Sequence, residues 1–61
     1  MDEEKLRLIA AEKGWRLRRV IRRKYKDTVI LDNDKKGLTL TLYLKCKLED
    51  TTESDWRDWL L

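Results

Sequence analysis

An alternating pattern in the second half of the chain constrains the fold most. From residue 38 to residue 48, five leucines and one cysteine occupy the even positions. A period of two is typical of a strand with one buried and one solvated face. We therefore predict a strand over residues 38–48. Its buried face would hold Leu38, Leu40, Leu42, Leu44, Cys46 and Leu48, and its wet face Thr39, Thr41, Tyr43, Lys45 and Lys47.

A second strand is predicted just before it, over residues 26–32. The segment Thr28–Leu31 is rich in β-branched residues, which favour strands. Residues 32–37 read Asp-Asn-Asp-Lys-Lys-Gly, a composition typical of turns. The two strands are therefore expected to form a β-hairpin.

The N-terminal residues 2–13 have the pattern of an amphipathic helix. Leu6, Ile9 and Ala10 follow the spacing of one buried stripe. Asp2 is a suitable N-cap, and Gly14 is a suitable left-handed residue just after the helix. We expect the helix to end there, with the following Trp15 folded back on its apolar side.

Residues 52–61 are predicted to form a second, short helix. Thr52 and Asp55 have the spacing of a capping box, with Asp in place of Glu. Trp56, Trp59 and Leu60 then share one face. We expect the three tryptophans to meet around the helix ends and to enlarge a core that lacks phenylalanine.

The segment from Trp15 to Lys26 is strongly basic. It carries seven cations and no acid, whereas the rest of the chain has 8 basic and 12 acidic residues. Leu17, Val20, Ile21 and Tyr25 could form a helical stripe, so a helix is one interpretation. The Gly-Trp stop and the Trp, Val, Ile and Tyr content favour a strand over residues 15–22 instead.

Together these elements predict an α+β fold in the order α-β-β-β-α. The 61 residues are enough for a single small domain over residues 1–61. We expect a three-stranded antiparallel sheet with both helices on its leucine face. The other face of the sheet would then be open to solvent.

The composition argues against catalysis and metal binding. The chain has no histidine and one cysteine, so it lacks an imidazole base, a zinc quartet and an internal disulfide. The parity of Cys46 indicates a core position, and Ser54 lies near a helix start. Asp32, Asp34 and Gly37 match part of a calcium loop, but Lys36 and Tyr43 stand where ligands are required.

We expect no enzyme activity, no metal and no cofactor, and the single thiol indicates a reducing, cytoplasmic setting. No segment is apolar enough to cross a membrane.

The basic segment carries the functional hypothesis. If it runs extended, cations on alternate residues lie about 6.6 Å apart, close to the spacing of phosphates along one strand. Threonine hydroxyls and a tyrosine on the same face could contact phosphates and stack on a base. The predicted nucleic-acid-binding residues are Arg16, Arg18, Arg22, Lys24, Lys26, Thr41, Tyr43, Lys45 and Lys47.

Three other interpretations of this surface stay open. The basic strand could dock an acidic protein surface, as in a small viral or accessory protein. The partner could also be a second copy, whose acidic ends would receive the strand and give a homodimer. Finally, the chain could be a designed scaffold without ligand.

The residues Glu12-Lys13-Gly14-Trp15, followed by Arg18, resemble the helix end that opens the first strand in HicA-type RNA-cleaving toxins. The element order also resembles that of the double-stranded-RNA-binding domain. The resemblance implies an α-β-β-β-α fold. The toxins' catalytic histidine is absent, so their nuclease activity is not implied. Glu53-Ser54-Asp55 is acidic where the RNA-binding domain has lysines at its second helix.

Overall fold

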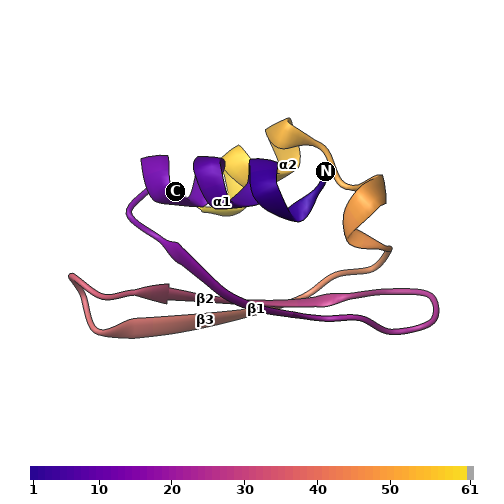
Figure 1. Cartoon of the computed structure of the whole chain (residues 1–61), viewed down its shortest axis with the longest axis horizontal. Coiled ribbons are helices and arrows are strands. Elements are labelled where there is room, and N and C mark those ends of the chain that lie inside the picture. Colours follow the sequence, from indigo (N-terminus) through magenta and orange to yellow (C-terminus); the bar gives the residue numbers. More distant parts are fainter. Residues whose placement is uncertain (61) are drawn as a thin grey trace.

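The computed structural model describes residues 1–60 and confirms the predicted α+β fold in the order α-β-β-β-α. Both helices lie on one side of the sheet, and the opposite face of the sheet carries no helix (Figure 1). A single 3₁₀ turn, η1, precedes the last helix. The elements are α1 (Glu3–Glu12), β1 (Arg16–Ile21), β2 (Thr28–Asn33), β3 (Leu38–Tyr43), η1 (Leu48–Asp50) and α2 (Glu53–Trp59).

The sheet is antiparallel, with β2 in the centre and β1 and β3 at the edges. Its registers define which residues share a face. The rows Leu17–Leu31–Leu40 and Val20–Val29–Leu42 face the helices and contribute to the core. The rows on the open face are Arg16–Asp32–Thr39, Arg19–Ile30–Thr41 and Ile21–Thr28–Tyr43.

Helix α1 spans Glu3–Glu12, within the predicted residues 2–13, and it has the predicted N-cap and terminal glycine. The Asp2 carboxylate accepts a hydrogen bond from the Lys5 amide at 2.7 Å. At the other end Gly14 adopts φ +84°, and the Trp15 amide donates to the Ala10 carbonyl at 2.8 Å. Because a residue with a Cβ rarely adopts this conformation, the glycine sets where the chain turns into β1.

Helix α2 begins with the predicted capping box between Thr52 and Asp55. Trp56 is fully buried, and its indole N–H donates to the Thr51 hydroxyl at 2.8 Å. Trp59 packs edge-on against Trp56 with ring centroids 5.0 Å apart, but it stays partly exposed. Trp15 packs against the core only in part. The tryptophans therefore extend the core unequally, and Trp56 is its largest buried side chain.

Strand β3 is shorter than predicted, because it ends at Tyr43 rather than at residue 48. Leu44 and Leu48 are nevertheless buried, so the alternation persists beyond the strand. In this stretch the chain leaves the sheet and rises toward the helix layer, held by backbone hydrogen bonds between Asp27 and both Leu44 and Cys46. The pattern beyond Tyr43 reflects packing under the helices and not a longer strand.

The basic segment is extended only as far as Ile21, and it contains a β-bulge. Leu17 pairs with Leu31 and Arg19 with Ile30, which leaves Arg18 as the extra residue. The bulge lets two consecutive arginines face solvent while Leu17 and Val20 both face the core. The predicted simple alternation through residues 15–26 is therefore wrong, and so is the helical alternative.

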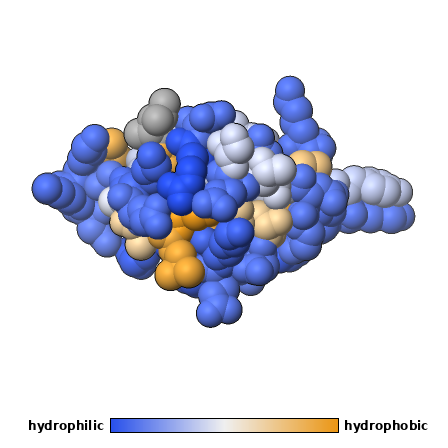
Figure 2. Space-filling model, turned by 90° about the horizontal axis from the view of Figure 1, so that it is seen from above, coloured by the Kyte–Doolittle hydropathy of each residue, from blue (hydrophilic) through white to orange (hydrophobic). Residues whose placement is uncertain are grey.

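The helix side of the surface is mainly hydrophilic, with a small group of hydrophobic residues between polar ones (Figure 2). This fits a chain in which 44% of the residues are charged. Over residues 1–60, neither helix has the length and apolarity required to span a bilayer.

Candidate nucleic-acid interface

The sequence predicted a cationic open face of the sheet. In the structure this face is instead divided into two ends of different charge. The end near the β2–β3 turn carries Arg16, Arg18, Asp32 and Thr39. The end near the β1–β2 connection carries Thr28 and Tyr43. The charge at each end depends on which cations are paired with carboxylates of the same chain.

At the first end the arginines are neutralised. Arg16 contacts Asp34 at 3.1 Å and Asp32 at 3.2 Å, and Arg18 donates to Asp32 at 2.7 Å. The Thr39 hydroxyl also donates to Asp32, at 2.9 Å. Burial alone would raise the pKa of Asp32, but hydrogen bonds from Arg18 and Thr39 and the nearby positive charges hold it below its ordinary value. Two arginines and two aspartates thus form a closed network with no net charge, and Arg16 and Arg18 are engaged within the chain.

Arg22 and Lys47 are also neutralised, around the buried side chain of Asp27. Arg22 lies 2.9 Å and the Lys47 ammonium 2.6 Å from the Asp27 carboxylate. Arg22 also pairs with the exposed Glu49 at 2.9 Å. These contacts join the connection between β1 and β2 to η1, so Arg22 and Lys47 act in holding the fold together.

The Asp27 carboxylate has two further donors, both from the backbone. The Leu48 amide donates at 2.8 Å and the Arg23 amide at 3.2 Å. Burial alone would raise the pKa of Asp27, but the hydrogen bonds from Lys47, Leu48, Arg23 and Arg22 outweigh it and hold the pKa well below its ordinary value. Asp27 is therefore a fully satisfied buried anion.

The second end keeps cations without such partners. Among residues 1–60, no ion pair engages the four side chains that we call the basic end: Arg23, Lys24, Lys26 and Lys45. Two tyrosines accompany them, Tyr25 at 75% and Tyr43 at 76% exposure. The Lys24 ammonium lies 5.3 Å from the centre of the Tyr25 ring. The basic end thus combines four available positive charges with two exposed aromatic rings.

A hollow of about 420 Å³ lies within this end, and we call it the basic groove. Its lining combines three cations of the basic end with one aromatic ring. The lining residues are Arg23, Lys26, Thr28, Tyr43, Leu44 and Lys45. Thr41 lies one row from Tyr43 on the same open face, next to Arg19 and Ile30. The structure therefore brings together Lys26, Tyr43 and Lys45 of the predicted site, with Thr41 nearby and Lys24 next to Arg23 in the chain.

The sequence prediction missed Arg23 and Tyr25, because strict alternation placed them on the core face. A signal was present, since Arg22, Arg23 and Lys24 put cations on both parities. A regular half-buried strand does not accommodate charge on both faces, so such residues lie either outside the strand or at a bulge. Arg19 was missed for the same reason and is exposed through the bulge.

Other candidate residues take structural positions. Cys46 is half-buried rather than in the core, and it lines a second cavity beside α2. Within residues 1–60, no group of three or more Asp, Glu or Cys side chains is arranged to hold a metal ion. Asp32 and Asp34, the acids of the calcium-like motif, instead accept hydrogen bonds from Arg16.

No protein-family model matches the chain, and no curated protein or solved structure is significantly similar to it. The resemblance to HicA-type toxins and to the double-stranded-RNA-binding domain therefore stays a prediction.

Proposed function

We propose that the chain is a small, non-enzymatic binding domain that holds single-stranded nucleic acid in the basic groove. The observation that carries the proposal is the clustering of Arg23, Lys26 and Lys45 around Tyr43, with no carboxylate of residues 1–60 paired to these cations. Cations that are not already paired within a protein are the ones available for phosphates.

The aromatic rings favour a single strand over a duplex. Sequence-tolerant binding of single strands combines a cationic path for the backbone with aromatic rings on which bases stack. Tyr43 lies within the groove, and Tyr25 lies beside Lys24, in the chain between the lining residues Arg23 and Lys26. Bases in a duplex are already stacked on one another and do not offer their faces to a tyrosine ring.

The same cations could also attract an acidic protein segment. Nucleic acid and an acidic segment differ in whether the Tyr43 ring contributes to binding. An acidic peptide needs only the charges, whereas a nucleic acid also uses the ring. The exposure of both tyrosines at the basic end favours nucleic acid.

The reducing, cytoplasmic setting is a prediction from the single cysteine.

Salt dependence gives the first test. Binding of a fluorescein-labelled oligothymidine is measured by anisotropy at several salt concentrations. Each phosphate neutralised on a single strand contributes about 0.7 to the slope of log K against log salt, so three cations predict a slope of about −2. The affinity should then fall about 16-fold between about 50 and 200 mM salt.

The control distinguishes nucleic acid from a general anion. Polyglutamate of matched charge is added as competitor, and Tyr43→Ala is titrated alongside the parent chain. We expect poor competition and a loss of about 1–3 kcal/mol in binding by the variant. A flat salt response, or equal binding of the oligonucleotide by Tyr43→Ala, would rule out the proposal.

A further inference from the structure

The two edges of the sheet differ in how they are protected. The β1 edge carries Arg16, Arg18 and Arg19 and contains the bulge, which are features that prevent pairing with another strand. The β3 edge has the sequence Leu-Thr-Leu-Thr-Leu-Tyr, with no charge, no proline and no bulge in its pairing with β2. In a chain with 44% charged residues, this uncharged edge is open to another strand.

The core-facing side chains of β3 are also incompletely covered. Helix α1 packs on β1 and on α2. Leu38 is 53% exposed, and Leu40 and Leu42 are only half-buried. A row of leucines on the helix side of the sheet therefore remains accessible along this edge.

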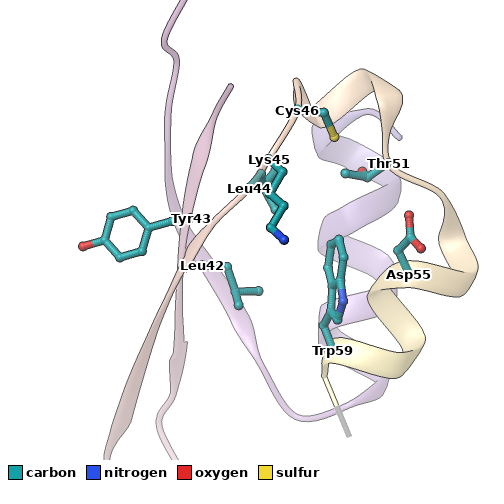
Figure 3. Close-up of a pocket in the computed structure, with 8 residues that line it drawn as sticks. All are labelled: Leu42, Tyr43, Leu44, Lys45, Cys46, Thr51, Asp55 and Trp59. Carbon is teal, nitrogen blue, oxygen red and sulfur yellow. The ribbon is translucent and has the colours of Figure 1, made fainter. Parts of the chain in front are cut away.

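A cavity of about 440 Å³ opens at the far end of the same strand, between the end of β3 and α2. Figure 3 shows Leu42 and Trp59 on the side of α2, whereas Tyr43 points away to the other side. Trp59 is 44% exposed here, although its neighbour Trp56 is fully buried. Leu44 and Lys45 also line the cavity. This is an apolar socket beside an unpaired strand.

The exposed leucine and the socket lie at opposite ends of one strand, so two copies fit each other. If two β3 strands pair antiparallel about a twofold axis at Thr41, Leu38 of one copy lies opposite Leu44 of the other. Leu38 has the same parity as Leu40 and Leu42, and Leu44, just beyond the strand, is buried in the core, so both lie on the helix side. Each Leu38 would then reach the socket beside Trp59 of the other copy.

The socket carries one charge of each sign, from Asp55 and Lys45. Asp55 lines the socket, and Lys35 and Lys36 precede Leu38 in the β2–β3 turn. Neither lysine has an ion pair among residues 1–60. The arrangement would bring the basic turn of one copy toward Asp55 of the other, at a socket that also carries Lys45.

We infer that a second copy of this chain pairs along β3 and forms a continuous six-stranded sheet, with each Leu38 seated beside Trp59 of the other copy. The dimer differs from the one expected from sequence, in which acidic ends received the basic strand. It leaves Arg23 and Lys26 outside the pairing edge, whereas Tyr43, Leu44 and Lys45 line both the basic groove and the socket. The inference does not depend on nucleic-acid binding. Standard interfaces bury at least about 1,200 Å² in total, and a six-residue edge with two sockets lies at the small end. We therefore expect a dimer that dissociates at micromolar concentration and forms at millimolar concentration.

Sedimentation equilibrium across that range tests the inference with a matched pair of variants. Leu38→Asp is expected to weaken the dimer about 30-fold or more, because each dimer loses two buried leucines and gains two carboxylates in its interface. Leu8→Asp makes the same substitution at an exposed leucine on α1, which is 65% exposed, and should dimerise like the parent chain. Circular dichroism checks that both variants are folded.

A measurement on the parent chain makes the result independent of the variants. In a mixture of labelled and unlabelled chains, isotope-filtered nuclear Overhauser effects should connect Leu38 methyl groups with the Trp59 indole of another molecule. A monomeric mass at millimolar concentration would overturn the inference. A dimer without these contacts, or one that Leu38→Asp leaves unchanged, would also overturn it.

Discussion

Replacing Asp27 by asparagine is expected to destabilise the fold by about 3 kcal/mol. The Asp27 side chain is fully buried and accepts hydrogen bonds from Arg22, Lys47 and two backbone amides. Asparagine has nearly the same shape, but it carries no charge and turns an NH₂ group toward these donors. The Lys47 ammonium donates to one carboxylate oxygen and the Leu48 amide to the other, so either orientation of the asparagine amide leaves one of these two donors without an acceptor.

This loss is large for a chain of this size. Stabilities of about 0.05–0.15 kcal/mol per residue correspond to about 3–9 kcal/mol for 61 residues. Thermal unfolding followed by circular dichroism should show Tm lowered by about 15 °C. Asp34→Asn, at an exposed carboxylate paired with Arg16, is the matched control and should change Tm little. Equal Tm values for the parent chain and Asp27→Asn would contradict this account of the Asp27 cluster.

The same cluster predicts how stability depends on pH. The pKa of Asp27 is lower in the folded chain than its ordinary value of 3.8, so the unfolded chain binds more protons as the pH falls. The stabilisation is complete above the ordinary value and is lost progressively below it. The free energy of unfolding should therefore fall on acidification from about pH 5 to pH 2, and more steeply in the parent chain than in Asp27→Asn. If the free energy of unfolding fell equally steeply with pH in the parent chain and in Asp27→Asn, Asp27 would not be the source of this pH dependence.

Charge reversal at the basic groove is expected to have the second large effect. The double variant Arg23→Glu with Lys26→Glu should weaken oligothymidine binding about 100-fold or more, since two phosphate contacts become repulsive. Both side chains are exposed, and the hydrogen bonds of Arg23 within the fold come from its backbone. Stability should therefore change by less than about 0.5 kcal/mol per substitution.

A second double variant controls for net charge. Lys35→Glu with Lys36→Glu makes the same substitutions in the turn at the other end of the sheet. Each pair lowers the formal net charge from +3 to −1. The control should retain most of the affinity, because long-range attraction alone does not hold the ligand. If both pairs weakened binding equally, net charge and not the groove would explain the binding.

The local signals in the sequence were sufficient for the fold class. The Asp2 cap, the Gly14 turn and the Thr52–Asp55 capping box each depend on residues close together in the chain. The hairpin between β2 and β3 follows from alternation and turn composition. These caps and turns can be predicted from sequence because the residues that form each of them lie within a few positions of one another.

The charge pattern of the surface could not be read in the same way. Arg16 and Arg18 are neutralised by Asp32 and Asp34 because the strand register brings these residues together. The Asp27–Lys47 pair spans 20 residues and depends on where the chain leaves the sheet. Alternation predicts which face a residue occupies, but not which carboxylate lies next to it. The predicted site therefore moved from the whole sheet face to one end.

Mapping amide chemical shifts during titration with a short oligothymidine tests the central claim most directly. The account predicts that shifts concentrate in residues 22–28 and 43–47, around the basic groove, and fade toward the Arg16–Asp32–Thr39 row. Shifts centred on that row, or no shifts at low salt, would contradict it.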